Sequence, residues 1–261
     1  MAGQLITRRE GTTGYIIFSN VEKHNAVNFD MWKALPDAVA AYNADPEVRA
    51  ILVMGDGDKA FISGADISEF EKRRGSADAS AEYNHAGDVA ANTLAASKKP
   101  TIAKIRGICF GGGVGVALCC HIRICSDDSR FCVPAARLGL GYAYTGLKRL
   151  IDVVGPSFAA EIFATARRYS AAEALQMKLV NRSVPAADLD RVANEYLTSI
   201  GENAPMTVAA ALIAIREAMK PSGERDLNAV QAMVDACFAS EDYIEGRRAF
   251  TEKRKPAFKG R

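Results

Sequence analysis

The chain has 261 residues, and its 33 Lys and Arg against 31 Asp and Glu leave a net charge of +2. This balance gives no strong positive field for nucleic acid or for an anionic membrane surface. The length allows one large domain or two modest ones, and no run of about twenty apolar residues could span a bilayer.

The N-terminal segment and the cysteines indicate the compartment. The segment MAGQLITRRE lacks the apolar block of a signal peptide and the pattern of an organelle presequence. The cysteines show no paired metal-ligand spacing and mostly lie in apolar runs: Cys109, Cys119, Cys120, Cys125, Cys132 and Cys237. We therefore expect no metal site, buried reduced thiols and a cytoplasmic protein.

The first part of the chain predicts strands and helices in alternation. Two strands flank a Gly-Thr-Thr-Gly turn, and the second, over Tyr15–Phe18, is the apolar one. Asn28 is the predicted N-cap of a helix that ends at the Asp45–Pro46 break, and Pro36 should kink that helix. The run RAILVMG at 49–55 predicts a short buried strand.

Further along, residues 67–80 are charged and polar around a glycine, which predicts a mobile loop. A helix over about 81–97 precedes a strand in KKPTIAKIRG, and GGGVGVALCCHIRICS predicts a glycine turn, an apolar helix and a strand. From about Ser170 onward the pattern is almost wholly helical, beginning with a serine cap. The sequence thus predicts a strand–helix core followed by a helical tail.

An unusual turn lies in FISGADISEF at 61–70. Gly64 lets the backbone turn where a side chain would clash, and Asp66 and Ser68 are typical of the start of a helical turn. Such a turn leaves backbone N–H groups without partners, so they are available to a ligand.

A second turn lies in RGICFGGGVGVAL at 106–118. Its consecutive glycines bring bare N–H groups to a helix N-terminus, which favours an anion or an oxyanion. Two alternatives are tight packing of the helix on a sheet and a dinucleotide site, although the spacing is G-x-G-x-G rather than G-x-G-x-x-G. Two glycine turns that each open a helix can direct one N–H apiece at the same carbonyl oxygen, as in an oxyanion hole.

The chain resembles the crotonase (enoyl-CoA hydratase/isomerase) superfamily over nearly its whole length. Five ordered segments carry the resemblance: EKHNAVN at 22–28, KAFISGADISEF at 59–70, KKPTIAKIRGICFGGGVGVAL at 98–118, SRFCVPAARLGLG at 129–141 and EKRKPAFKG at 252–260. The resemblance implies an α/β fold, with a crotonase-like spiral of ββα units over 1–200 and a helical trimerisation region over 201–261. It also implies a homotrimer or hexamer and an acyl-CoA substrate, with no cofactor beyond the coenzyme A of that substrate.

Carried over position by position, the resemblance places an oxyanion hole at the backbone N–H groups of Ala65 and Gly112. These groups would hold the thioester oxygen as it becomes an enolate. The implied coenzyme A contacts lie on two loops and on the C-terminal tail, which in the family can reach coenzyme A across a subunit contact: Lys23 to Ala26, Ser63, Ala65, Asp66, Ile67, Ser68, Phe258 and Lys259.

This sequence departs from the hydratase pattern at the positions of the two hydratase glutamates. The matching positions are Gly115 and Ala135, which carry no ionisable group, whereas hydration needs an acid and a base. The run PAARLGLGYAYTG resembles methylmalonyl-CoA decarboxylase of the same superfamily, which lacks both glutamates and has a tyrosine after its Leu-Gly pair. Its histidine falls at Ala65 here, so the match is partial. Tyr142 is the candidate polar group, and a pocket-wall aromatic is the alternative.

His24 lies in the implied coenzyme A loop. Other polar residues are more typical of structural or surface roles: Arg137, His85, His121, Glu69, Glu71 and Glu82. The basic end EKRKPAFKGR is more typical of a solvated tail than of an RNA-binding one. Three functions stay open. They are an enoyl-CoA hydratase/isomerase-type lyase that stabilises a thioester enolate, a malonyl-type decarboxylase that uses Tyr142, and a non-catalytic protein that binds coenzyme A thioesters.

Overall fold

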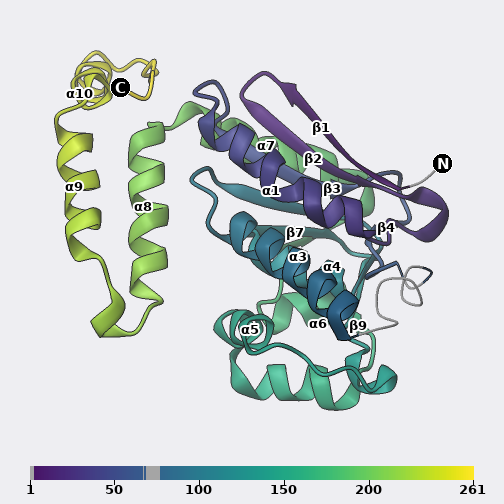
Figure 1. The fold of residues 1–261 in the computed structure, drawn as a ribbon. Helices are drawn as coiled ribbons and strands as arrows, with labels where there is room; N and C mark the ends of the chain where they lie inside the picture. The colour runs from purple at the N-terminus through teal and green to yellow at the C-terminus, as the bar shows by residue number, and fades with distance from the viewer. Residues whose placement is uncertain (1–2, 67, 69–76) are drawn as a thin grey trace.

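The computed structural model describes residues 3–66, 68 and 77–261. The chain forms two sheets with helices packed around them (Figure 1). The larger sheet has the strand order β1-β2-β3-β5-β7-β10, and the smaller has the order β4-β6-β8-β9. The bounds of these strands are β1 Gln4–Glu10, β2 Thr13–Ser19, β3 Ala50–Gly55, β4 Ala60–Ile62, β5 Thr101–Ile105, β6 Ile108–Phe110, β7 Ile122–Ser126, β8 Arg130–Cys132, β9 Tyr169–Ser170 and β10 Arg182–Val184.

From β3 to β8, successive strands alternate between the two sheets. Each of the pairs β3–β4, β5–β6 and β7–β8 places its first strand in the larger sheet and its second in the smaller. Helices α3 (Ala77–Ala95), α4 (Gly112–Cys119) and α5 (Tyr144–Thr165) follow these pairs in turn. The chain therefore winds as a spiral of ββα units, and the predicted α/β fold is confirmed.

The central strands of the larger sheet are buried on both faces. In β3, Ile51 and Val53 belong to one apolar cluster, whereas Leu52 packs in a second cluster with Leu189 of α7 (Leu189–Glu202). A parallel strand that is covered on both faces needs an uninterrupted apolar run, because side chains alternate between the faces. The run AILVMG meets this need, and the predicted strand is confirmed.

Local capping signals in the sequence are also confirmed. The Asn28 side chain accepts a hydrogen bond from the Met31 N–H at 2.9 Å and caps α1 (Phe29–Ala44), which includes Pro36. Ser170 caps α6 (Ala171–Gln176) in a reciprocal capping box. These signals are readable because each joins residues that are three apart in the chain.

The predicted helical tail after Ser170 is confirmed except at β10, which pairs in parallel with β7 and completes the larger sheet. One predicted boundary is wrong. The helix predicted over 81–97 occupies Ala77–Ala95, so the loop predicted for 67–80 is wrong at 77–80. The rest of that predicted loop, apart from Ser68, lies outside the described residues.

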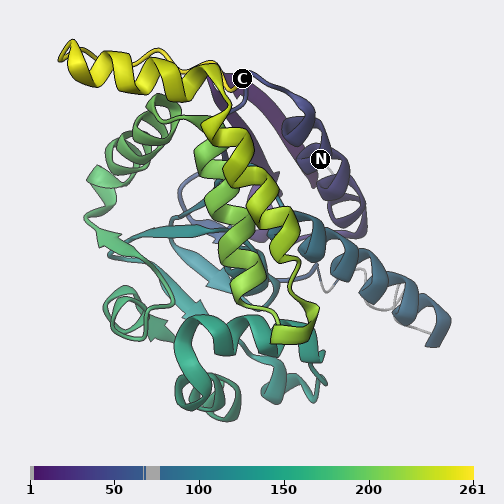
Figure 2. The same ribbon diagram turned by 90° about the vertical axis from the view of Figure 1, so that its left-hand side faces the viewer.

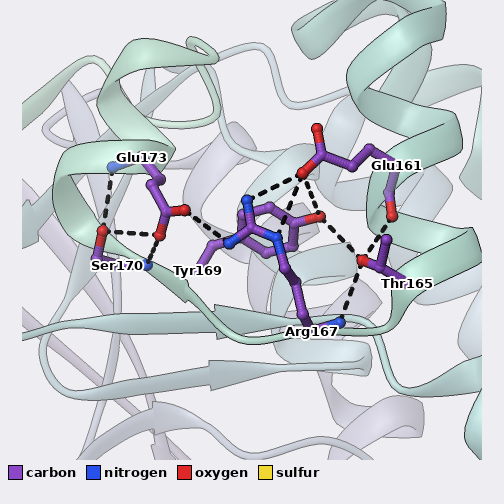
Figure 3. Close-up of polar contacts among 6 residues, drawn as sticks. All are labelled: Glu161, Thr165, Arg167, Tyr169, Ser170 and Glu173. Carbon is purple, nitrogen blue, oxygen red and sulfur yellow. Dashed lines mark hydrogen bonds and ion pairs between the residues drawn. The ribbon is translucent and has the colours of Figure 1, made fainter.

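A polar cluster around Arg167 holds the end of α5 against β9 and α6 (Figure 3). The Arg167 guanidinium donates to Glu161 at 2.9 Å and to Glu173 at 2.6 Å, and it stacks 3.8 Å from the Tyr169 ring centroid. Hydrogen bonds from the Ser170 backbone, from Arg167 and from the Ser170 hydroxyl lower the pKa of Glu173 to about 2. The buried Tyr169 ring and this charged network together fix where α5 ends.

The C-terminal helices lie beside the spiral. Figures 1 and 2 show α8 (Pro205–Ala218) and α9 (Leu227–Phe238) side by side, with α10 (Glu241–Thr251) at the end of the pair. Large apolar side chains are exposed on this part of the chain: Ile215, Met219, Leu227, Phe238, Ile244 and Phe250. Within the described residues no helix is both long and apolar enough to cross a membrane.

The cysteines behave as the sequence predicts. All six are free thiols, and each except Cys237 is buried. Burial raises the pKa of the Cys119 thiol to about 11 and that of Cys125 to about 12. These thiols are therefore protonated at neutral pH and act as small apolar side chains.

Candidate active site

The turn after β4 leaves one backbone N–H directed away from the sheet. Val27 and Ala65 form a parallel bridge in which Val27 N–H donates to Gly64 O and Asp66 N–H donates to Val27 O, both at 2.8 Å. In a parallel bridge the residue between the two bonded groups directs its own N–H to the opposite side. The Ala65 N–H therefore points away from Val27, and no acceptor for it occurs among the described residues.

The second glycine turn starts α4. Gly111 has φ +50° and is the N-cap, so Gly112 is the first helical residue and its N–H has no partner within the helix. A Cβ on Gly113 would lie 2.3 Å from Ile62 O, which shows that this glycine allows the helix to pack tightly on β4. The predicted packing role of the glycines is thus confirmed at Gly113, while Gly112 is left with a free N–H.

The two turns face each other. A Cβ on Gly112 would lie 3.8 Å from the Ala65 nitrogen and 3.6 Å from the Trp32 ring. Within the described part of the chain, neither the Ala65 nor the Gly112 N–H donates a hydrogen bond. Trp32 is itself fixed by a hydrogen bond from its Nε1 to the Tyr83 hydroxyl at 3.1 Å. The arrangement places two unpaired backbone N–H groups from separate turns near each other.

A polar loop closes on the same turn. The Lys23 ammonium lies 2.7 Å from Asp66 Oδ2 and 2.7 Å from Ser68 Oγ, and the Ser63 hydroxyl donates to Lys23 O at 3.0 Å. The Ala26 N–H donates to the same Lys23 carbonyl at 3.1 Å. The structure therefore brings together all the predicted coenzyme A residues of the two loops, except Ile67, which lies outside the described residues.

Asp66 is ionised at neutral pH although it is buried. Burial by itself would raise its pKa, but hydrogen bonds from Lys23 and from the Ser68 side chain and backbone outweigh this and lower the pKa. The carboxylate accepts the Ser68 N–H at 3.1 Å and so holds the start of the following segment. The contact between Asp66 and Ser68 agrees with the expectation for the start of a turn, and the residues that would continue a helical turn lie outside the described residues.

Asn25 is an organising residue that the sequence analysis missed. It is fully buried with φ +58°, and its side chain donates to Asp56 O and Ala60 O and accepts the Asn20 N–H. Asparagine tolerates positive φ better than most residues, and its amide satisfies three backbone groups at once. The pair of asparagines in NVEKHNA was the available signal for a constrained loop.

The two positions that match the hydratase glutamates differ in environment. A Cβ on Gly115 would meet nothing within 4 Å, one helical turn beyond Gly112 on α4. Ala135, in the short helical turn Ala135–Leu138, is 4% exposed and belongs to the main apolar cluster. Open space therefore lies where a side chain of residue 115 would project, whereas position 135 is packed.

Tyr142 lies between α4 and α5. Its ring packs edge-on against Phe163 with the centroids 4.8 Å apart, and burial, with a smaller effect of Cys119, raises its pKa. Cys119 is four residues after Gly115, so the two lie on one face of α4. Tyr142 is partly buried, and its hydroxyl has no hydrogen-bond partner among the described residues but is not sealed from solvent.

The remaining candidates do not gather at this site. The His121 Nδ1 lies 2.8 Å from Thr101 Oγ1, and burial lowers the pKa of His121 to about 4, which confirms its structural role. Arg137, His85 and Glu82 are exposed. Glu69 and Glu71 lie outside the described residues.

Phe258 and Lys259 lie near the amino end of β3, at the opposite end of the larger sheet from the two loops. Phe258 O accepts a hydrogen bond from Arg49 at 3.0 Å, and the Lys259 N–H donates to the buried Asp242 at 2.6 Å. Arg49 precedes β3, whereas the Ala65 turn follows the carboxyl end of that strand and of β4. The six residues of β3 span about 20 Å. The tail therefore does not reach the two loops of its own chain.

A spiral of ββα units with two facing glycine turns defines the crotonase class of α/β proteins. The enoyl-CoA hydratase/isomerase family model matches residues 8–261, and the chain belongs to this family, whose members process acyl-CoA. It is 32% identical to a crotonyl-CoA hydratase of Syntrophomonas wolfei over 97% of each chain. It is 33% identical to a short-chain-enoyl-CoA hydratase of Clostridium acetobutylicum over 98% of each.

Solved structures of the same family resemble this chain over nearly its whole length. A crystal structure of an enoyl-CoA hydratase/carnithine racemase from Magnetospirillum magneticum has a TM-score of 0.92 and 32% identity, covering 98% of this chain and 96% of that one. An enoyl-CoA hydratase/isomerase family protein from Hyphomonas neptunium has a TM-score of 0.93 and 33% identity, covering 98% of each. The predicted superfamily is confirmed.

The contrast between positions 115 and 135 gives a stability prediction. Gly115→Glu should keep the free energy of unfolding within about 1 kcal/mol of the parent, because its side chain enters open space and glycine is a poor residue inside a helix. Ala135→Glu should lower it by roughly 3 kcal/mol or more, because it places a carboxylate in an apolar cluster. Urea unfolding measures both, and Ala135→Gln separates charge from size. Equal losses at 115 and 135 would contradict this account.

Proposed function

We propose that the protein binds an acyl-CoA thioester and stabilises its enolate with the backbone N–H groups of Ala65 and Gly112. The observation that carries the proposal is that these two groups are unpaired and lie in facing turns. Fixed dipoles that point at a developing oxyanion stabilise the transition state without reorganisation during the reaction. Family membership supports the thioester as the carrier of that oxygen.

We propose that coenzyme A lies along the two polar loops. The support is the contact of Lys23 with Asp66 and Ser68, and of Ser63 with the Lys23 carbonyl. Lys23 would supply a positive charge, and Ala26 and the turn from Ser63 to Ser68 would supply backbone and hydroxyl groups. Ile67 shares this proposed role by its position in the sequence.

The reaction itself is constrained by what positions 115 and 135 lack. Hydration needs one group to activate water and another to protonate the α-carbon, and neither Gly115 nor Ala135 supplies a carboxylate. Decarboxylation of a malonyl-type acyl-CoA is the second candidate. In it the C–C bond breaks, carbon dioxide leaves and the electron pair enters the thioester enolate, which is then protonated at the α-carbon. The unpaired Tyr142 hydroxyl beside α4 and the open space at Gly115 favour this candidate.

Gly112→Pro tests the oxyanion role. Proline removes the N–H and is accepted at the first position of a helix, so α4 should still form. Loss of one oxyanion donor typically lowers turnover roughly 10²–10³-fold. The control is Gly112→Ala, which adds a methyl in ordinary contact at 3.6–3.8 Å but retains the N–H. A folded Gly112→Pro variant with full activity on every substrate would refute the assignment.

Tyr142→Phe, assayed on crotonyl-CoA and methylmalonyl-CoA, separates the reactions. If Tyr142 donates or orients a proton, turnover of methylmalonyl-CoA should fall about 10²-fold or more while coenzyme A affinity is unchanged. Tyr144→Phe is the matched control, because Tyr144 is 75% exposed two residues further on. Turnover of crotonyl-CoA alone would exclude the decarboxylase. Binding of both thioesters, measured by calorimetry, with turnover of neither would favour a non-catalytic protein.

We also propose that the chain assembles as a trimer or as a dimer of trimers through α8–α10. The exposed apolar side chains of these helices support this, since they need burial. Light scattering at micromolar concentration should give the mass of three or six chains. Phe238→Asp should shift the mass towards one chain, and Val89→Asp, on the exposed part of α3, should not. A monomeric parent protein would contradict the proposal.

A further inference from the structure

A small basic cavity lies at the end of the larger sheet where β3 and β5 begin, opposite the candidate active site. Its volume is about 180 Å³, and Arg49, Lys98, Lys99 and Pro205 are among the residues that line it. Arg49 and Lys99 come just before β3 and β5, so the cavity lies at the amino ends of these parallel strands. The Ala65 turn follows their carboxyl ends, which makes the cavity a separate site.

One nitrogen of the Arg49 guanidinium in this cavity lacks a partner. Arg49 Nη2 donates to Phe258 O at 3.0 Å, but Arg49 Nη1 is buried and has no hydrogen bond. Buried donors in folded proteins are almost always paired, and a guanidinium is costly to leave without an acceptor. Because Arg49 also lines the cavity, an acceptor that enters the cavity would lie next to this guanidinium.

A second cation, Lys99, lines the same cavity. Lys99 is half-buried, and burial together with the positive charge of Arg49 lowers its pKa. Among the described residues no carboxylate lies within 4.0 Å of the Lys99 ammonium, and its Nζ forms no hydrogen bond. Two neighbouring like charges repel each other, so the pair favours an anion between them.

The side-chain acceptors nearby already have partners. The Asp45 carboxylate acts on Lys99 only at a distance, while it lies 3.9 Å from Arg9 and accepts the Glu47 N–H at 2.9 Å. The Asn43 Oδ1 accepts from Ser97 and from the Lys98 N–H. The positive end of α8, which begins at Pro205, adds to the field in the cavity.

We propose that this cavity binds a small oxyanion, such as inorganic phosphate, between Arg49 and Lys99. Its volume is below that of pockets for drug-sized ligands, so it excludes a whole coenzyme A molecule and admits a small anion. A guanidinium donates two parallel hydrogen bonds to such an oxyanion. The bound anion ties β3, β5 and the start of α8 together, and Arg49 extends the connection to the C-terminal tail at Phe258.

Thermal unfolding of the full chain with phosphate tests the site, and chloride of equal ionic strength is the reference. Phosphate at a hundredfold excess over its Kd should raise the Tm of the parent by about 5–10 °C. Lys99→Met should abolish this shift, and Lys33→Met, which removes the same charge from the exposed side of α1, should retain it. In chloride, Lys99→Met should be at least as stable as the parent, because it removes the repulsion with Arg49.

Titration calorimetry with inorganic phosphate provides the direct measurement. One phosphate should bind per chain in the parent and in Lys33→Met, and none in Lys99→Met. No saturable binding to the parent, or equal binding to both variants, would overturn the proposal. Because the readouts are unfolding and phosphate binding, their result is independent of any activity on acyl-CoA.

Discussion

The close approach of backbone to backbone around β4 is the constraint on which the candidate site depends. A Cβ on Gly107 would lie 2.1 Å from Lys59 O, and one on Gly113 would lie 2.3 Å from Ile62 O. Only glycine permits α4 and the β5–β6 connection to pack this tightly on both ends of β4. Tight packing brings the start of α4 to the turn after β4, and therefore brings the Gly112 N–H to the Ala65 N–H.

In the candidate site, the groups that would bind the thioester oxygen belong to the backbone, whereas the groups that would transfer protons are side chains. The N–H groups of Ala65 and Gly112 are set by the fold, so most side-chain substitutions leave them in place. The groups that move protons are side chains, and they can change one position at a time. In this chain Gly115 and Ala135 lack carboxyl groups, yet the facing turns are intact. On the proposed function, the scaffold would therefore stabilise an enolate irrespective of the bond that is made or broken.

The sequence predicts local features better than pairings. The Asn28 cap and the Ser170 capping box are readable, because each involves residues three apart. Strands β9 and β10 have two and three residues, too few to show an alternating pattern, and their partners lie far along the chain. The contact of Lys23 with Asp66 joins residues 43 apart. Only the family resemblance placed these two residues in one predicted site.

The position of the tail connects assembly with ligand binding. Asp242 binds Lys259 and Arg49 binds Phe258 at the amino end of β3 in the larger sheet. The two loops lie beyond the carboxyl end of that strand. A tail that contacts coenzyme A must therefore belong to another copy of the chain. Residues of α10 bind that tail, and α10 also has the exposed apolar side chains Ile244 and Phe250, so burying these against a second copy would position both together. On this proposal the monomer has the oxyanion donors but an incomplete coenzyme A site, and affinity for the thioester depends on protein concentration.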